Sequence, residues 1–177
     1  MSDEASGSAW LTAETARHYQ LFTEKTNMYQ ELSQVTVDLA QLKLGQRVLD
    51  LGCGTGVTTR LVLSALGAEG HIYALDISGP MLDIARQMIA DERITFIHDA
   101  AEKVCDGLPQ PVDRVVCNSV FWQVRHTSDV LTALRKILVP DGLFVFNAPE
   151  PYFIFQHFPR SSKVSTLFKQ LVAERYG

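Results

Sequence analysis

The chain has 177 residues, a length that fits one ordinary domain with a sizeable buried core. Its hydrophobic content of 46% and charged content of 20% are values of globular proteins and exclude wholesale disorder. The formal net charge of −4 is mild and the basic residues are scattered, which argues against a nucleic-acid partner and against an anionic membrane surface.

The cysteines and the apolar runs bear on the setting of the protein. Cys53, Cys105 and Cys117 are odd in number and lack the spacing of metal ligands, which favours a reducing, cytoplasmic setting and no metal site. No apolar run approaches the roughly 20 residues that span a bilayer, and the start MSDEASGSAW is not typical of a signal peptide. We therefore expect a soluble protein with no membrane partner.

The N-terminal region, residues 1–44, is expected to hold a disordered tail followed by helix. From Thr12 to Leu42 the spacing of apolar residues is helical. One apolar stripe is predicted for this helix, formed by Leu32, Val35, Leu39 and Leu42. Gly45 then ends the helical pattern.

In the central segment, residues 45–148, short apolar runs alternate with helical stretches. The predicted strands are RVLDL (47–51), HIYALD (71–76), ITFIH (94–98), DRVVCN (113–118) and LFVFNA (143–148). Strands of this kind, near-continuously apolar and separated by helices, predict a doubly wound α/β domain in which helices cover both faces of a parallel sheet.

Three helices are predicted between these strands. TTRLVLSALG closes on Gly67, and SGPMLDIARQMIA has Ser78 as its cap and Pro80 in its first turn. SDVLTALRKIL follows, and a turn is expected after it at Pro140-Asp141-Gly142. The core face of this last helix is predicted to hold Val130, Leu134 and Ile137.

The octapeptide LDLGCGTG, residues 49–56, follows the first predicted strand. Ligands of such sheets bind beyond the carboxyl ends of the strands, where the strand order reverses. Gly52, Gly54 and Gly56 allow a tight turn and a close approach of the backbone to a ligand. The free N–H groups of the next helix favour a negative group. These features fit a dinucleotide or another adenosine-containing cofactor.

Two details separate these cofactors. The dinucleotide fingerprint G-x-G-x-x-G needs a glycine at position 57, where this chain has Val57. Asp50 precedes the first glycine, where a carboxylate would repel a pyrophosphate but suits a ligand with an ammonium and a sulfonium. A helix or loop cap is the structural alternative for Asp50.

From about Gln46 to Pro149 the sequence resembles the class I S-adenosylmethionine-dependent methyltransferases. VLDLGCGTG resembles the first motif of that family, and LRKILVPDGLFVF resembles its segment before and into the fifth strand. The resemblance implies a Rossmann-like sheet of strand order 3-2-1-4-5 and S-adenosylmethionine as the cofactor. It also implies methyl transfer to an O, N, S or C nucleophile of a small-molecule metabolite.

The resemblance assigns roles to single residues around the cofactor. Asp76 would bind both ribose hydroxyls, since a carboxylate accepts two O–H donors at once. HDAAE resembles the third-strand motif, in which Asp99 accepts from the adenine amino group and the Ala100 N–H donates to the ring. A turn cap is the alternative for Asp99, and core packing for Met81. The expected cofactor contacts are Asp50, Gly52, Cys53, Gly54, Gly56, Asp76, Ile77, Met81, Asp99, Ala100, Asn118 and Ser119.

The segment CNSVFWQVRH is expected where the cofactor meets the acceptor. Amino-directed DNA methyltransferases carry Asp or Asn, then Pro-Pro and an aromatic residue, at the corresponding place. Here Asn118 is followed by Ser119-Val120, so the segment more nearly resembles the small-molecule enzymes. Trp122 is a candidate acceptor contact, with packing between strand and helix as its alternative.

Three further residues are candidates on the acceptor side. Tyr19 and Tyr29 belong to the region that in relatives folds over the cofactor as a lid, and anchoring a helix on the sheet is their alternative. His126 is a candidate catalytic base, with a solvated loop histidine as its alternative. A base is needed only if the nucleophile must lose a proton, so no catalytic residue is required by the chemistry.

Two other functions stay open beside the methyltransferase. One is a module that binds S-adenosylmethionine without catalysis, since no catalytic residue stands out. The other is a nicotinamide-dependent oxidoreductase, which both Val57 and Asp50 disfavour.

The C-terminal segment, residues 149–177, is expected to hold an aromatic loop and a helix. Relatives continue with a helix and two further strands, of which the last pairs antiparallel beside the fifth, and the remaining length hardly has room for that hairpin. We therefore expect a C-terminally truncated family member that lacks the hairpin. LFVFNA would then be an unpaired apolar edge strand, which we expect a homodimer to bury. The alternative is that the segment PYFIFQHF covers this edge or lines the acceptor pocket.

Overall fold

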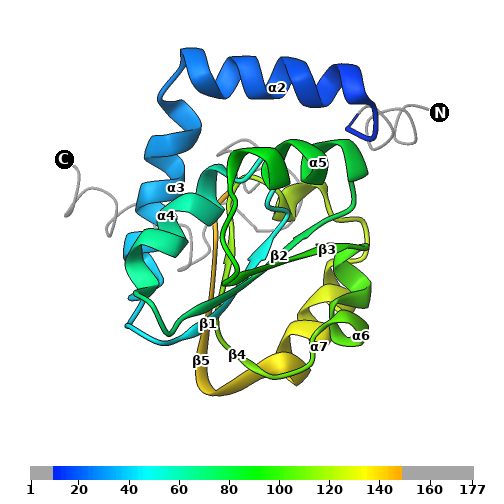
Figure 1. The fold of residues 1–177 in the computed structure, drawn as a ribbon. Helices are drawn as coiled ribbons and strands as arrows, with labels where there is room; N and C mark the ends of the chain where they lie inside the picture. Colours follow the sequence, from blue (N-terminus) through cyan, green and yellow to red (C-terminus); the bar gives the residue numbers. More distant parts are fainter. Residues whose placement is uncertain (1–9, 149–177) are drawn as a thin grey trace, which may run out of the picture. The chain divides into compact units, whose positions relative to one another are not determined.

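A five-stranded parallel sheet forms the centre of the protein in the computed structural model, which describes residues 10–148. The strands are β1 (Arg47–Leu51), β2 (His71–Asp76), β3 (Ile94–His98), β4 (Val112–Cys117) and β5 (Leu138–Phe146). Their order is β3-β2-β1-β4-β5, and every neighbouring pair is parallel (Figure 1). The predicted doubly wound fold and its strand order are therefore confirmed.

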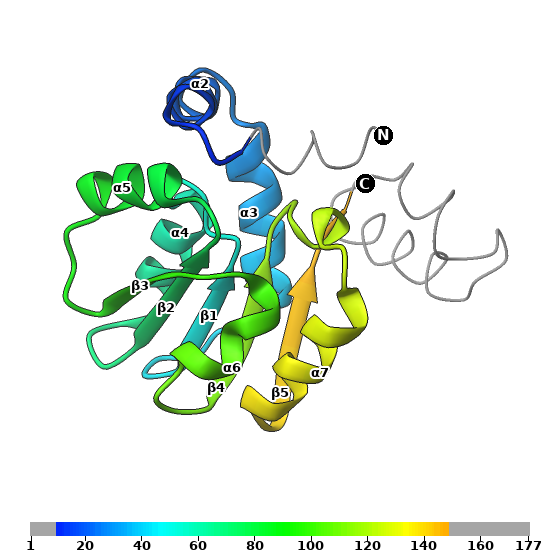
Figure 2. The ribbon, with the colours of Figure 1, turned by 90° about the vertical axis from the view of Figure 1, so that its right-hand side faces the viewer.

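Helices cover both faces of this sheet. They are α2 (Ala13–Lys25), α3 (Met28–Leu39), α4 (Val57–Leu66), α5 (Gly79–Met88), α6 (Val104–Gly107) and α7 (Thr127–Ile137). Figure 2 shows α6 and α7 on one face and α3 and α4 on the other, with α2 above the end of the sheet toward which the strands point. The loops at that end therefore lie beneath α2.

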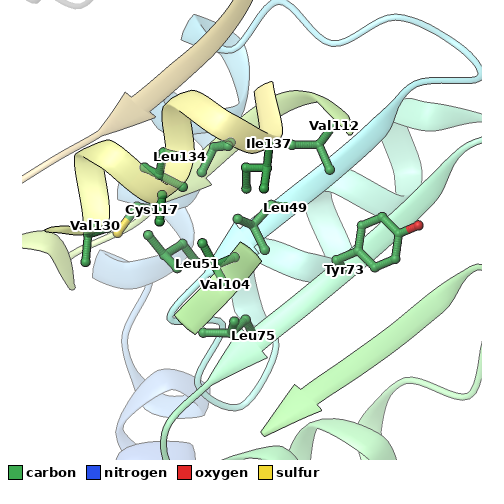
Figure 3. Close-up of a cluster of buried hydrophobic side chains, with 12 residues drawn as sticks. Leu49, Leu51, Tyr73, Leu75, Val104, Val112, Cys117, Val130, Leu134 and Ile137 are labelled. Atoms are coloured by element: carbon green, nitrogen blue, oxygen red, sulfur yellow. The ribbon is translucent and has the colours of Figure 1, made fainter. Parts of the chain in front are cut away.

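The face beneath α6 and α7 carries one hydrophobic cluster. Leu49 and Leu51 of β1 and Leu75 of β2 are buried there, next to Val130 and Leu134 of α7 (Figure 3). Residues two apart in a strand point to the same side, so alternate residues of β1 build this cluster. The predicted core face of the helix over 127–137 is confirmed.

The opposite face carries a second cluster, which α3, α4 and α5 cover. Its strand residues alternate with those of the first cluster. The buried members are Val37, Ala40, Val48, Cys53, Val62, Leu66, Ile72, Ala74, Leu82 and Val116. Burial on both faces explains why the strands are near-continuous apolar runs.

The predicted helix signals of α4 and α5 are confirmed. Gly67 ends α4 with a φ of 67°, in the left-handed region that glycine tolerates. The Ser78 hydroxyl accepts a hydrogen bond from the Met81 N–H at 3.4 Å, and Pro80 lies in the first turn of α5. Gly67 thus fixes the end of α4, and Ser78 fixes the start of α5 two residues after β2.

The predicted helical region from Thr12 to Leu42 forms two helices, and the predicted leucine stripe is not the buried face of the second. Thr26 has an extended backbone that separates α2 from α3. The buried face of α3 consists of Ser33, Thr36 and Val37, whereas Leu32 is 37% exposed. The reason is the close approach of α3 to α4, which small and hydrogen-bonded side chains permit and leucines would not.

The predicted turn before the fifth strand is also wrong in part. β5 begins at Leu138, immediately after α7, and runs through the expected turn residues. Val112 pairs with Leu138 but Arg114 pairs with Leu143, so the extra residues form a bulge in which Asp141 has a φ of 65°. The turn residues thus interrupt the ladder without ending the strand.

Two expectations concern other parts or properties of the chain. The loop and helix predicted over residues 149–177 lie outside the described residues. In the described part of the chain, no helix is both long enough and apolar enough to cross a membrane.

The packing of α7 gives a direct test. Leu134→Ala should lower the free energy of unfolding by about 2–5 kcal/mol, because it removes buried methyl groups and leaves a cavity. Leu131 in the same helix is 48% exposed, so Leu131→Ala should change it by less than about 0.5 kcal/mol. Urea unfolding followed by circular dichroism measures both variants. Equal losses would contradict the observed face of α7.

Candidate functional site

A cavity of about 460 Å³ lies at the carboxyl ends of β1, β2 and β4. This is where the strand order reverses, the place at which doubly wound sheets bind ligands. The lining residues are Trp10, Leu11, Tyr19, Tyr29, Leu51, Gly52, Gly54, Leu75, Asp76, Ile77, Ser78, Met81, Ala101, Glu102, Asn118, Ser119, Val120, Gln123, Val124, Arg125 and His126.

The glycine loop, residues 52–56, forms one wall of the cavity with bare backbone. Gly52 has a φ of 75° and donates its N–H to the Leu75 carbonyl at 2.8 Å. A Cβ atom on Gly52 would lie 2.5 Å from Val120 Cγ1, so only glycine fits there. A Cβ atom on Gly54 would lie 3.6 Å from Tyr19 Cε1, on the side of the N-terminal helices. The loop is therefore packed between Val120 and Tyr19.

Asp76 lies at the end of β2 and organises the floor of the cavity. Its Oδ2 accepts from the Gly54 N–H at 2.8 Å and its Oδ1 accepts from the Ser78 N–H at 2.8 Å. Burial raises the pKa of Asp76, and the two N–H donors offset part of that effect. Each carboxylate oxygen has a further lone pair, so Asp76 can accept two more hydrogen bonds from a ligand.

Asp50 lies behind the glycine loop and outside the cavity lining. It is 1% exposed, and its Oδ2 accepts from the Thr59 hydroxyl of α4 at 2.6 Å. This bond ties β1 to α4 between two side chains, and it is not the helix or loop cap named as the alternative for Asp50, since α4 has no side-chain cap. The Asp50 Oδ1 is buried without a protein partner. Burial raises the pKa of Asp50 to about 7, against which the Thr59 hydrogen bond acts.

The lid, defined as residues 10–39, contributes aromatic rings to the cavity. Trp10 and Tyr19 have ring centroids 5.8 Å apart and Tyr19 and Tyr29 5.1 Å apart, both edge to face. Burial raises the pKa of both tyrosines, so their hydroxyls stay protonated. The Ser78 hydroxyl donates to the Trp10 carbonyl at 2.7 Å and so ties the start of the lid to the loop after β2.

The loop after β4, residues 118–126 and named the acceptor-side loop for its predicted role, forms another wall of the cavity. Asn118, Ser119 and His126 line the cavity, as the sequence predicted for their neighbourhood. Trp122 is not among the lining residues. Its indole N–H donates to the Ser119 carbonyl at 2.9 Å, because the short helical turn Phe121–Gln123 directs the ring back onto its own loop.

Asp99 and Ala100 also lie outside the lining. The Ala100 N–H donates to Asp99 Oδ1 at 2.8 Å, so Asp99 caps the turn after β3. The Lys103 ammonium lies 3.9 Å from the same carboxylate. Contact of this pair with an adenine ring therefore stays a prediction, while the next two residues, Ala101 and Glu102, line the cavity.

The structure brings most of the predicted site residues together. Those in the lining are Gly52, Gly54, Asp76, Ile77, Met81, Asn118, Ser119, Tyr19, Tyr29 and His126, while Asp50, Cys53 and Gly56 support the loop from behind. Sequence reasoning missed Trp10, Ser78, Gln123 and Arg125 as lining residues. Ser78 gave a signal as a helix cap, two residues after Asp76.

Comparison with known proteins agrees with this geometry. The family described as "Methyltransferase domain" matches residues 48–142. The ubiquinone/menaquinone biosynthesis C-methyltransferase UbiE of Methylococcus capsulatus is 32% identical over 115 residues, which cover 63% of this chain and 46% of the relative. UbiE of Vibrio vulnificus is 33% identical over 122 residues, which cover 67% of this chain and 47% of the relative. The chain thus spans about half the length of the curated relatives it matches.

Solved structures agree as well. An S-adenosylmethionine-dependent methyltransferase from Mesorhizobium loti is 26% identical, with a TM-score of 0.59 and coverage of 69% of this chain and 56% of that chain. A proposed enzyme of this class from Methanococcus maripaludis is 14% identical and shows the fold alone, with a TM-score of 0.65 and coverage of 93% and 73%.

The fold and the site define a class I S-adenosylmethionine-dependent methyltransferase domain. The chain belongs to the methyltransferase-domain family, whose cofactor is S-adenosylmethionine. The residues present fit that cofactor. Asp76 has acceptor sites left for ribose hydroxyls, Gly52 and Gly54 line the cavity without side chains, and the buried Asp50 Oδ1 lacks a protein partner.

The raised pKa of Asp50 predicts a pH dependence of stability in the cofactor-free chain. Since the folded carboxyl holds its proton up to about pH 7, the folded state loses stability as pH rises from about 4 to 7, by roughly 4 kcal/mol at most. Asp50→Asn keeps an acceptor for Thr59 and should remove this loss. The free energy of unfolding of Asp50→Asn should therefore exceed that of the wild type by much more at pH 8 than at pH 4.

Denaturant unfolding at both pH values measures the effect. Asp83→Asn, which changes an exposed aspartate of α5, is the matched control and should follow the wild type. An equal difference between Asp50→Asn and the wild type at both pH values would contradict the prediction.

Proposed function

We propose that the protein transfers the methyl group of S-adenosylmethionine to a small-molecule metabolite. One observation carries the proposal: a single cavity joins the glycine loop and Asp76 to a separate wall made of lid tyrosines and the acceptor-side loop. A module that only bound the cofactor would need the first of these walls but not the second. Support also comes from the names of the curated relatives, which are methyltransferases.

Methyl transfer requires little covalent chemistry from the side chains of the protein. When bound, S-adenosylmethionine supplies a methyl group already activated by its sulfonium, so transfer is an in-line displacement. The residues of the chain hold the two reactants in line, which contributes up to about 7–11 kcal/mol in favourable systems. Asp76 would fix the ribose, and the rings of Trp10 and Tyr19 would exclude water from above.

The cavity favours a small and largely apolar acceptor. Leu11, Val120 and Val124 line it together with the two lid tyrosines. Among the nucleophiles left open by the sequence, the relatives' names favour carbon, because they are named as C-methyltransferases. A carbon nucleophile must lose a proton, and His126 in the lining is the proposed base.

Labelled transfer tests this function. The chain is incubated with metabolite extracts and S-adenosylmethionine that carries an isotope-labelled methyl group, and labelled products are identified by mass spectrometry. A labelled small molecule that depends on active protein is the expected result. Tight binding of the cofactor with no labelled product from any pool would leave the non-catalytic module as the function.

Asp76→Ala should weaken binding of S-adenosylhomocysteine by about 1.5–3 kcal/mol, because charge-assisted hydrogen bonds to the ribose are lost. Titration calorimetry measures the affinity, with NAD as a ligand that should not bind. Asp129→Ala, at an exposed aspartate of α7, is the matched control. Unchanged affinity in a folded Asp76→Ala variant would show that Asp76 does not hold the ribose.

The predicted self-association is also part of the proposal. Among the described residues, β5 pairs with β4 on one side only, and Leu143 is 37% exposed. The unpaired edge strands of two copies can pair with each other, which is a common route to dimers. Light scattering coupled to size exclusion should give the mass of a dimer, and a monomer at high concentration would contradict it.

A further inference from the structure

The backbone of Ser119 is unusual for a residue that lines the cavity. Its φ is 59°, in the left-handed region that residues other than glycine rarely adopt. Such a conformation persists only where the surroundings hold it, and it is frequent at functional sites. The Ser119 carbonyl is held from its own loop, since it accepts from the Trp122 indole N–H at 2.9 Å and from the Gln123 amide at 3.2 Å.

The other polar groups of Ser119 are held by Asn147, which follows β5. Asn147 Oδ1 accepts from the Ser119 N–H at 2.7 Å and from the Ser119 hydroxyl at 3.1 Å. The Asn147 amide group donates to Thr36 Oγ1 at 3.0 Å and to Asn118 Oδ1. Two donors and two acceptor sites are all that a carboxamide offers, so every hydrogen-bonding position of Asn147 is used.

These bonds continue into the lid and into the helix after the glycine loop. The Asn118 amide donates to Ser33 Oγ of α3 at 2.8 Å, and Ser33 Oγ lies 2.9 Å from Thr58 Oγ1 in the first turn of α4. Ser33, Thr36 and Thr58 are buried. In buried surroundings each such bond is strengthened, and a partner left alone is costly. The network therefore has one geometry in which all its members are satisfied.

We propose that Asn147 is a positioning residue of the site: its carboxamide fixes the Ser119 turn and joins that turn to the lid helix α3. Asn147 is not among the residues described as lining the cavity, so it acts through Asn118 and Ser119, which are. The step from positioning to turnover rests on the methyl transfer proposed above. The hydrogen bonds by which Asn147 fixes the Ser119 turn do not depend on that function.

Side-chain chemistry explains why an asparagine is required. An aspartate could accept from Ser119 but, when ionised, could not donate to Thr36 and Asn118. An alanine would leave the Ser119 N–H and the Thr36 and Asn118 oxygens without this partner. The loop would then be free to leave the left-handed conformation, and the wall of the cavity that it forms would lose its fixed place.

Hydrogen exchange measured by mass spectrometry tests the hold directly. In Asn147→Ala, amide exchange of the peptide over residues 115–124 should become at least about tenfold faster, the factor expected for a buried hydrogen bond removed. Thr36→Val keeps the side-chain shape and removes the bond between Asn147 and the lid, together with the bond from the Thr36 hydroxyl to the Leu32 carbonyl within α3. It should accelerate exchange of the 115–124 peptide about threefold. Asn27→Ala is the matched control, because the Asn27 side chain caps nothing in α3.

Binding and transfer separate positioning from simple stability. Affinity for S-adenosylhomocysteine should fall by less than about threefold in Asn147→Ala, whereas methyl transfer should slow by about tenfold or more, at a temperature at which all variants are folded. The proposal would be overturned if Asn147→Ala were less stable but showed amide exchange and methyl transfer at the rates of the wild type. Should Asn147→Ala not fold, Thr36→Val decides by the same readouts. Should the wild type transfer no methyl group, the proposed function fails while exchange still decides the role of Asn147.

Discussion

The carboxylate of Asp76 is the constraint on which the cofactor side of the site depends. Its two oxygens accept the N–H groups of Gly54 and Ser78, so one side chain sets both the glycine loop and the start of α5. The Ser78 hydroxyl then holds the lid through the Trp10 carbonyl. Removing the carboxylate from water raises its pKa, and the N–H donors are the groups that keep the charged form accessible. The carboxylate of Asp76 thus holds the glycine loop and the start of α5, and through Ser78 it is linked to the lid.

In a parallel sheet that is buried on both faces, polar side chains are accommodated mainly at the ends of the strands. The strands carry apolar residues toward both helix layers, so hydrogen-bonding side chains collect where the strands end. Asp50 is a buried carboxyl within β1, and it accepts a hydrogen bond from Thr59 on the helix that follows the glycine loop. A carboxylate buried there favours a ligand with positive charge.

Sequence patterns predicted the parts of the fold that depend on local periodicity. β1, β2 and β3 agree with the apolar runs residue by residue, and Ser78 and Gly67 mark the helix ends. β5 was misjudged because turn residues stand inside a bulged strand. The buried face of α3 differs from the predicted leucine stripe because it includes the small polar side chains of Ser33 and Thr36, whose partners lie on α4 and after β5. Contacts over long sequence separations, such as Ser78 with Trp10 or Asn147 with Ser119, leave no periodic signal to read.

The two walls of the cavity are held by different hydrogen-bond systems. Asp76 organises the cofactor side, and Asn147 organises the acceptor side, and both systems reach the lid, through Trp10 in one case and Thr36 in the other. Val120 packs on Gly52 where the two sides meet, too closely for any side chain on that glycine. Because the lid is held by both systems, a change on either wall alters the same pair of helices.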